Sequence, residues 1–565
     1  MRHVVLVHFL EKRERILFLL IVFISIFLLL IYRLYNIQVV GSSVLHELAR
    51  KEHIASYIVD GKRGVIFDRN FKKLATNIES KSLFAIPYRI EQPEQTSRLL
   101  SSKLGLTSQD VEKELTKERY FVWIDRKLSQ GKYEEIKSLD LDGLDFVTEN
   151  KRFYPKESLA ANLIGFVGID NQGLEGLELY FDNELKSQSG LIVMERDASG
   201  AKIPLSTEMI QPAKNGLSIV LSIDEVIQYI TEEALHKAFQ QYHPKSAVAI
   251  VVNPKTGEIL SLAVRPTFNS NNYQDSTEEY RRNRAITDNY EPGSTFKIFT
   301  IATALEHGYA SLSDHFNCKG WINYQGTVIR DIDPHGYQDL TEIVKNSCNV
   351  GVIEVGTRID KNIFAESINK FGFGEKTGID LPGESAGLFR PVSKWSKISN
   401  ASLSIGQEIS VTPLQLVMGV AAIANNGVLM KPLIVSKVLD EEDNIVKKYY
   451  PEEVRQVISP RTAKTMSRIL QEVVDNGTGS RAKLKHYPAA GKTGTSQKFD
   501  FALGRYSNEK FTSWFAGYAP VDEAEIAILV MLDEPKGSYY GGTVAAPVFQ
   551  EIASKTLPYL SIPPE

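Results

Sequence analysis

The sequence contains little cysteine and little net charge, and these shortages exclude several classes of protein. Cys318 and Cys348 are the only cysteines among 565 residues, too few for a disulfide-stabilised scaffold or a cysteine-based zinc site. The ten histidines include no HExxH or comparable ligand spacing, so we expect no metal and no other cofactor. The formal net charge is −4, which gives no reason to expect a nucleic-acid partner.

Long apolar runs are also absent, with one exception near the start of the chain. Residues 16–32 carry no charge and would rise about 26 Å as a helix, close to the thickness of a bilayer core. Four basic residues precede this run, and the positive-inside rule then leaves residues 1–15 in the cytoplasm. A cleaved signal peptide is the alternative, but its apolar core would be unusually long and no small-residue cleavage site follows closely. We therefore expect a single-pass anchor over residues 16–33 in the cytoplasmic (inner) membrane, with the remainder extracytoplasmic, in the periplasm.

The rest of the chain has the composition of a globular protein of at least two domains. Hydrophobic residues make up 43% and charged residues 24% of the sequence. Residues 37–215 are polar and mixed in pattern, with helix-like apolar spacing over 91–140, and they place no nucleophile beside a base. We therefore expect a spacer or interaction domain over 37–215 and a second, catalytic domain over 216–565.

The pattern of the second domain predicts an α/β fold of the α+β kind. Asp224 precedes an amphipathic helix as its N-cap, and two apolar strands follow, joined by the turn sequence NPKTG (253–257). The middle of the domain is mostly helical. Strands return after residue 490, and a closing helix follows near the C-terminus. Strands at both ends of the domain favour one antiparallel sheet flanked by helices.

The tripeptide Lys-Thr-Gly occurs three times, so most copies must be structural. Lys255–Gly257 lies in the predicted hairpin turn, and Lys376–Gly378 lies in a glycine-rich loop. The third copy, Lys492–Gly494, opens the late strands, and its Gly-Lys-Thr also resembles the end of a phosphate-binding loop. That loop needs a glycine five positions before Gly491, where this chain has His486, so the phosphate interpretation fails.

The strongest candidate for a nucleophile is Ser294, with Lys297 as its base. Ser-x-x-Lys occurs five times, at Ser129, Ser199, Ser294, Ser480 and Ser507. Only the third copy follows a Pro-Gly break and opens a long apolar helix, which brings Lys297 onto the same face. The lysine must be neutral to accept a proton, so we expect burial or neighbouring cations to lower its pKa. Ser347–Asn349, a second hydroxyl and an amide, follow; these residues either join the site or cap the next helix.

Together these motifs resemble a known family. STFK (294–297), SCN (347–349) and KTGT (492–495) stand in the order found in penicillin-binding proteins and serine β-lactamases. The segments RGVIFDRN (63–70), KRFYP (151–155) and GLEGLELYFD (173–182) extend the resemblance over nearly the whole chain. The chain is similar to class B penicillin-binding proteins of the cell-division branch. The resemblance implies a five-stranded antiparallel sheet flanked by helices, preceded by an elongated N-terminal pedestal or dimerisation domain.

The resemblance also implies an activity, that of a serine D,D-transpeptidase which cross-links peptidoglycan stem peptides during septal wall synthesis. Neutral Lys297 would take the proton of Ser294, which attacks the penultimate D-Ala carbonyl, and Ser347 would pass the proton to the departing D-Ala. Backbone N–H groups of Ser294 and Thr495 would hold the oxyanion. Binding of the D-Ala-D-Ala terminus, and of β-lactam antibiotics, is assigned to Asn349, Lys492, Thr493, Gly494 and Thr495.

Several alternatives stay open at this point. An elongation-specific transpeptidase of the same class, a carboxypeptidase and a penicillin-hydrolysing enzyme share the motifs; the Glu-x-x-x-Asn pair of one β-lactamase class is incomplete here, with Leu388 four residues after Glu384. A non-catalytic division scaffold is a further alternative. The family implies a membrane glycosyltransferase and other division proteins as partners. Cys318 and Cys348 could pair, although two buried free thiols are favoured.

Overall fold

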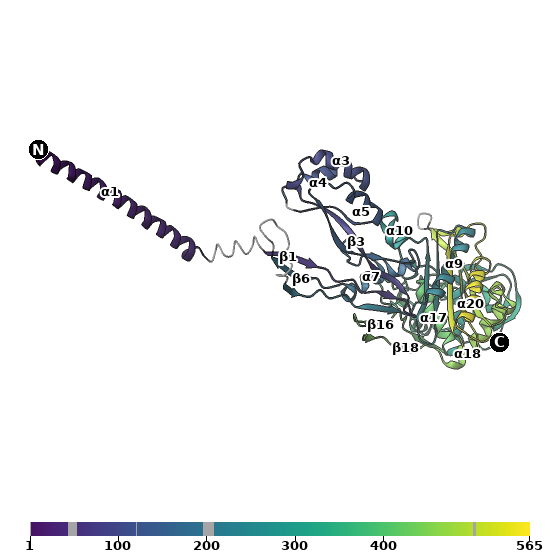
Figure 1. Cartoon of the computed structure of the whole chain (residues 1–565). Helices are drawn as coiled ribbons and strands as arrows, with labels where there is room; N and C mark the ends of the chain where they lie inside the picture. The colour runs from purple at the N-terminus through teal and green to yellow at the C-terminus, as the bar shows by residue number, and fades with distance from the viewer. Residues whose placement is uncertain (1, 43–53, 120, 196–207, 501–503, 565) are drawn as a thin grey trace. The chain divides into compact units, whose positions relative to one another are not determined.

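The computed structural model describes residues 2–42, 54–119, 121–195, 208–500 and 504–564 (Figure 1). The chain divides into two compact units, one of residues 1–61 with 188–214 and the other of residues 62–187 with 215–565. The larger unit therefore joins most of the predicted N-terminal domain and all of the predicted catalytic domain in one body.

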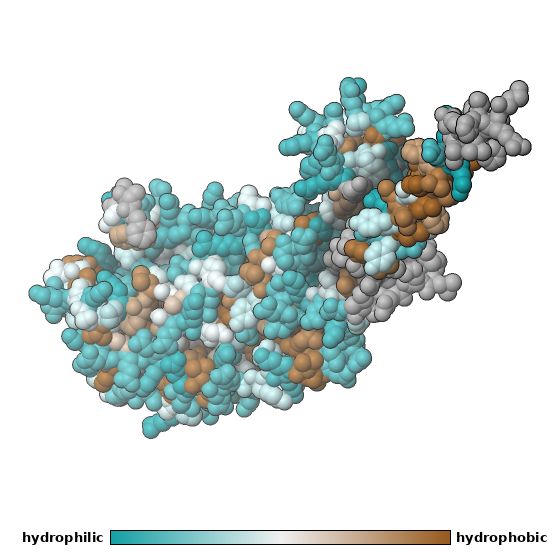
Figure 2. Space-filling view, turned by 90° about the vertical axis from the view of Figure 1, so that its left-hand side faces the viewer, coloured by the Kyte–Doolittle hydropathy of each residue, from teal (hydrophilic) through white to brown (hydrophobic). Residues whose placement is uncertain are grey.

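The smaller unit consists of a long helix and a small sheet. Helix α1 (Arg2–Tyr35) continues into a π-helical turn, η1 (Asn36–Val40). Its large apolar side chains are exposed from Ile16 onward, whereas most of the surface shown in Figure 2 is hydrophilic. Among the described residues, the stretch Arg13–Val40 is the one helix long and apolar enough to cross a membrane, and it fits a single-pass anchor. The antiparallel sheet has the order β1–β6–β7, with β1 (Ile54–Val59), β6 (Gly190–Glu195) and β7 (Glu208–Gln211).

The larger unit begins with a seven-stranded sheet. Its order is β17–β16–β8–β2–β3–β4, and β5 also pairs with β3. The strands are β2 (Ile66–Phe67), β3 (Lys73–Ala85), β4 (Val122–Leu128), β5 (Leu144–Phe153), β8 (Ser218–Leu221), β16 (Val435–Leu439) and β17 (Ile445–Lys448). Strand β2, from the predicted N-terminal domain, pairs in parallel with β8, from the predicted catalytic domain. The sheet thus combines strands from both predicted domains.

Three helices lie together at one end of β3 (Figure 1). They are α3 (Pro93–Leu104), α4 (Ser108–Leu115) and α5 (Gln130–Lys137). The sequence prediction of helix-like structure over 91–140 is therefore correct for these three segments and wrong for β4. Val122, Trp123 and Ile124 open that strand, and residues of this type favour a pleated surface where a partner strand is available.

A buried ion cluster holds the N-terminal part of this unit together. Glu178 accepts hydrogen bonds from Arg63 Nε at 2.6 Å and from Arg152 Nε at 2.7 Å, and all three side chains are at most 1% exposed. Arg63 also bonds Asp182 at 2.6 Å, and Tyr154 donates its hydroxyl to Glu178. These residues come from the three N-terminal segments that carry the family resemblance, so this cluster is what those segments build in space.

The catalytic sheet has the predicted antiparallel arrangement. Its order is β10–β9–β21–β20–β19, with β9 (Ser246–Val252), β10 (Ile259–Arg265), β19 (Ala490–Asp500), β20 (Arg505–Ala519) and β21 (Ile526–Asp533). Strands from the two ends of the domain therefore meet, as the apolar runs predicted. The turn between β9 and β10 is held by Asn253, whose side chain accepts from the N–H groups of Lys255 and Thr256.

Helices cover both faces of this sheet. Alternate residues of β9 pack into two different cores: Val248, Ile250 and Val252 face one, and Ala247, Ala249 and Val251 face the other. The second core includes α9 (Glu225–Tyr242), which begins at its predicted N-cap Asp224, and α20 (Ala546–Tyr559). The first includes α12 (Lys297–Glu306), α17 (Pro413–Ala424) and α18 (Pro460–Asn476).

The middle of the domain is helical, as expected, with short antiparallel strand pairs that were not predicted. Its other helices are α13 (Leu340–Lys345), α14 (Asn349–Gly356), α15 (Lys361–Lys370) and α16 (Ser399–Ser404). β12 (Trp321–Tyr324) and β13 (Thr327–Arg330) form a hairpin. Two further antiparallel pairs join β11 (His315–Cys318) with β14 (Gly336–Asp339) and β15 (Val428–Met430) with β18 (Glu453–Gln456).

Candidate active site

Ser294 lies on a tight turn pressed against the edge strand of the catalytic sheet. The turn is the 3-10 segment η5 (Gly293–Phe296), and α12 begins only at Lys297. Gly293 has a φ of 53°, a conformation that favours glycine. A Cβ on Gly494 would lie 2.8 Å from Thr295 Cγ2, so glycine is what lets β19 approach the turn. The partly exposed Ser294 side chain is thereby placed beside the third motif.

Lys297 is fully buried and is held by the second motif. Its Nζ donates to the Ser347 carbonyl at 2.6 Å and to Asn349 Oδ1 at 2.7 Å, with a longer contact of 3.4 Å to Ser347 Oγ. No hydrogen bond links Ser294 Oγ to Lys297 Nζ among the described residues. A neutral amine has two N–H donors and one lone pair. In the neutral form the two short bonds use both donors, which leaves the lone pair to accept a proton.

Burial lowers the pKa of Lys297 to about 8, although Asp331 and Cys348 act to raise it. Burial, and then the charge of Lys297, lower the pKa of Lys492 well below its usual value. Two amines that are buried near each other disfavour each other's protonated form. The site therefore has the property that the sequence analysis required, a lysine whose neutral form is accessible close to neutral pH.

The SCN motif forms the junction between α13 and α14. Ser347 has a φ of 58°, which is rare for a residue with a side chain and occurs often at functional sites. Cys348 is the N-cap of α14, and its sulfur accepts from Gly351 N at 3.2 Å. The capping role that was open for Ser347 or Asn349 is thus taken by the residue between them. Both neighbours instead contact Lys297.

The KTGT motif lies at the start of β19, the edge strand of the sheet. Lys492 is fully buried, and its Nζ donates to the carbonyl of Thr493 at 3.1 Å. Thr493 donates to Thr478 Oγ1 at 3.0 Å, and Thr495 Oγ1 accepts from Gly541 N at 3.1 Å. The structure thus brings Ser294, Lys297 and the SCN motif together and places the KTGT strand beside them.

Two residues beside this site were missed by the sequence analysis. Thr478 accepts from Thr493 and also contacts the Lys345 carbonyl at 3.4 Å, so it links the third motif to the end of α13. Glu291, three residues before the nucleophile, accepts from Tyr506 OH at 3.0 Å and from Glu408 N at 3.1 Å, and burial raises its pKa to about 7. A hydroxyl or carboxyl that acts through tertiary contacts has no spacing signal in the sequence.

The other copies of the short motifs have structural roles. Lys255 lies at the hairpin corner and pairs with Glu525 at 2.8 Å. Glu384 accepts from Thr377 N at 2.7 Å and so holds the loop of the second Lys-Thr-Gly copy. Its carboxylate therefore has a structural role and not that of the glutamate in the β-lactamase Glu-x-x-x-Asn pair. Ser129 is the N-cap of α5, and Ser507 accepts from backbone N–H groups in its own turn. Ser199 lies outside the described residues.

Comparisons with known proteins agree with this geometry. The penicillin binding protein transpeptidase domain matches residues 247–554, and the penicillin-binding protein dimerisation domain matches residues 58–221. Stage V sporulation protein D of Bacillus subtilis is 39% identical over 561 residues, which cover 98% of this chain and 86% of that protein. Peptidoglycan D,D-transpeptidase FtsI of Escherichia coli is 31% identical over 546 residues, covering 95% and 90%. The crystal structure of penicillin binding protein 3 from Mycobacterium tuberculosis, complexed with aztreonam, aligns with a TM-score of 0.72 and 28% identity, covering 90% of this chain and 98% of that one.

Proposed function

Because the chain belongs to the class B penicillin-binding proteins and is a peptidoglycan D,D-transpeptidase, we propose that Ser294 is its acylated nucleophile and Lys297 its general base. The observation that supports this assignment best is the environment of Lys297. A buried amine that donates twice to fixed oxygens has its lone pair left for one proton.

The proposed reaction proceeds in two steps. Lys297 takes the hydroxyl proton as Ser294 attacks the carbonyl of the penultimate D-Ala, and backbone N–H groups of Ser294 and Thr495 stabilise the oxyanion. Each such donor is typically worth about 3 kcal/mol. Ser347 then passes the proton to the leaving D-Ala. An amine from a second stem peptide resolves the acyl-enzyme and forms the cross-link.

The proposed binding site for the substrate carboxylate is the KTGT strand with Asn349. Lys492 makes no ion pair with a carboxylate among the described residues, so an anionic chain end would supply the missing counter-charge. Thr493 and Thr495 present hydroxyls on the same strand, and Gly494 keeps that strand close to the nucleophile. The carboxylate of a β-lactam has the same charge and would occupy the same place.

The test of this assignment is mass spectrometry of the full-length protein in detergent after treatment with benzylpenicillin. We expect one covalent adduct per chain, on the peptide that contains Ser294, and no adduct in Ser294→Ala. Ser480→Ala removes the serine of another Ser-x-x-Lys copy and serves as the control that should label normally. An adduct on a different residue, or undiminished labelling of Ser294→Ala, would refute the assignment.

The cellular role that we propose is cross-linking during septal wall synthesis. The N-terminal tail of residues 1–15 would face the cytoplasm because basic residues precede the apolar helix, and the catalytic domain of residues 216–565 would face the outside. Residues 37–215 would serve as a pedestal, and a membrane glycosyltransferase would supply the glycan strands. The test is localisation of a fluorescent fusion, which should gather at division sites; uniform labelling of the lateral wall would favour the elongation alternative.

A sporulation-specific role is the second candidate. It is supported by the 39% identity with stage V sporulation protein D, against 31% with peptidoglycan D,D-transpeptidase FtsI of Escherichia coli. Deletion in the native host separates the two roles. Loss of viability or filamentation supports the division role, whereas normal growth with a defect confined to spores supports the second candidate.

A further inference from the structure

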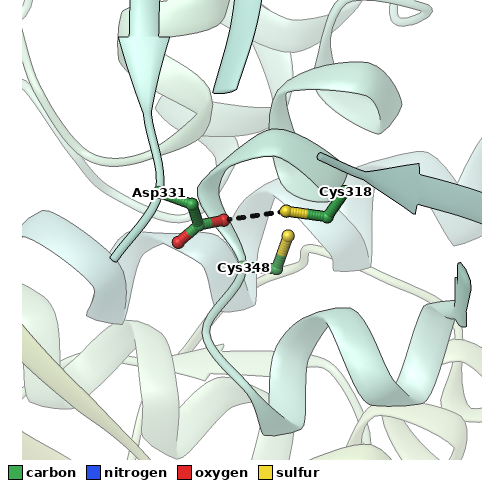
Figure 3. Close-up of side chains that lie close together, drawn as sticks. All are labelled: Cys318, Asp331 and Cys348. Atoms are coloured by element: carbon green, nitrogen blue, oxygen red, sulfur yellow. Dashed lines mark hydrogen bonds between the residues drawn. The ribbon is translucent and has the colours of Figure 1, made fainter. Parts of the chain in front are cut away.

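Two thiols and a carboxylate meet beside the second catalytic motif. Cys318 ends β11, Cys348 is the N-cap of α14, and Asp331 lies in the loop between β13 and β14. Their ligand atoms all lie within 4.8 Å of one another, and Figure 3 shows the three side chains converging. Both cysteines are buried free thiols, as favoured by the sequence analysis, and Asp331 is partly exposed. The cluster is thus closed on the thiol side and accessible on the carboxylate side.

The separation of the Cys318 sulfur from the Asp331 carboxylate suits a tetrahedral metal ion. Ligand bonds of about 2.3 Å to sulfur and 2.0 Å to oxygen place the two atoms about 3.5 Å apart in a tetrahedral zinc site. The Cys318 sulfur lies 3.6 Å from Asp331 Oδ2. Thiolate and carboxylate donors together favour zinc and similar thiophilic ions over magnesium or calcium, which take oxygen ligands.

The surroundings already hold the three donors in place. Asp331 Oδ2 accepts from Asn349 N at 2.7 Å and from Val350 N at 3.3 Å, and Gly351 N donates to the Cys348 sulfur. Such outer hydrogen bonds orient the ligands of metal sites.

We propose that Cys318, Asp331 and Cys348 bind one zinc-class divalent cation. Each thiol releases its proton to solvent as its sulfur binds the ion, and Asp331 binds as the carboxylate. From the sequence, two cysteines were too few for a cysteine-based zinc site. The fold brings a third ligand, Asp331, next to them. A water molecule can complete the tetrahedron at the accessible side.

Occupancy of this site would act on the catalytic lysine. Cys348 lies between Ser347 and Asn349, whose oxygens hold Lys297 Nζ at 2.6 and 2.7 Å. An ion bound to Cys348 holds the middle of this segment, and its other ligand, Asp331, accepts from Asn349 N at the end of the segment. We therefore expect metal binding to change the rate at which Ser294 is acylated, an effect that rests on the proposed function, whereas binding itself does not.

The test is metal titration of the reduced full-length protein in detergent. With Zn²⁺ we expect one ion per chain, and with Cd²⁺ the ultraviolet absorption of cadmium–thiolate bonds. Cys318→Ser and Asp331→Asn should each weaken binding at least about tenfold, because each removes a ligand. Asp333→Asn is the matched control, an exposed carboxylate two residues from Asp331, and it should bind as the parent does.

Three results would contradict the proposal. Absence of stoichiometric binding at micromolar Zn²⁺, or binding that Cys318→Ser leaves unchanged, overturns the proposal. So does an intact mass two hydrogens lower in protein purified without reductant, with a peptide linking Cys318 to Cys348, because a disulfide leaves no thiolate for metal. Labelling with fluorescent penicillin shows that each variant is folded, and it separates failure of the metal site from failure of the assigned nucleophile.

Discussion

Two regions of the larger unit bury charged side chains, and they differ in whether those side chains form ion pairs. In the N-terminal part, Arg63 and Arg152 enclose Glu178, and every charge has a partner of opposite sign. In the catalytic part, Lys297 and Lys492 are just as deeply buried, yet neither forms an ion pair among the described residues. The paired cluster serves structure. Burial without a counter-ion disfavours the protonated form of both amines in the free enzyme. A lysine with an accessible neutral form suits a general base, and a lysine without an ion-pair partner suits a site for an anionic substrate.

The sharpest way to break this comparison is Lys297→Met. Loss of a general base should lower the rate of acylation by about 10²- to 10⁴-fold. Stability should hold or rise, because an apolar side chain of similar length replaces a buried amine without a counter-ion. The measurements are stopped-flow labelling with fluorescent penicillin and thermal unfolding.

A matched control is available in another Lys-Thr-Gly copy. Lys255→Met removes an exposed lysine at the hairpin corner and should alter neither quantity measurably. If Lys297→Met lowers the unfolding temperature instead of the acylation rate, the lysine stabilises the fold as a cation. Its role would then be the same as that of the paired charges in the N-terminal part.

The second prediction concerns the paired region. Glu178→Gln leaves Arg63 and Arg152 buried without their shared carboxylate, and loss of one partner from a buried ion cluster costs about 3–5 kcal/mol. Burial opposes the charge of Arg63, yet Glu178 and Asp182 outweigh it and raise the pKa of Arg63 above its usual value. Chemical denaturation should show the loss, while the acylation rate of the folded fraction stays within about twofold.

The control for this variant is Glu94→Gln on α3, where the ion pair with Arg98 is exposed. It should leave the unfolding midpoint unchanged, because exposed pairs contribute little. Equal behaviour of the two variants would show that the buried cluster is not what holds the N-terminal part together.

The difference between the two regions also shows what could be predicted from the sequence. Ser294 and Lys297 were found because a Pro-Gly break precedes their Ser-x-x-Lys spacing and a long apolar helix follows it, and the catalytic sheet because its strands are long apolar runs. The roles of Thr478, Asp331 and Glu291 were not found, since each depends on a partner distant in the sequence. Strand β4 was missed because its pairing with β3 overrides a locally helix-like pattern. The segments of the paired cluster were recognised only by resemblance, and the ion pairs themselves needed the structure.

The third prediction is a pH dependence that belongs to the unpaired region alone. Lys297 acts as a base only when neutral, and its pKa is lowered to about 8. The acylation rate should therefore rise about tenfold per pH unit below this value and level off above it. Acylation rates measured from pH 6 to 9 with benzylpenicillin test this, and residual labelling of Lys297→Met should be flat. A parent profile that is flat through pH 8 would mean that a different group takes the proton.

The smallest expected effect belongs to Thr478, which links the KTGT strand to the end of α13, next to the second motif. Its hydroxyl accepts from Thr493 and reaches the Lys345 carbonyl, so Thr478→Val should loosen the KTGT strand without creating a cavity. One hydrogen bond is worth about 0.5–1.5 kcal/mol, which corresponds to a loss of about 2- to 10-fold in the second-order rate of acylation. Thr478→Ser keeps the hydroxyl and should retain most of the rate. If the serine variant loses as much as valine, the hydrogen bond alone does not position the strand, and packing of the Thr478 methyl group contributes equally to the link between the second and third motifs.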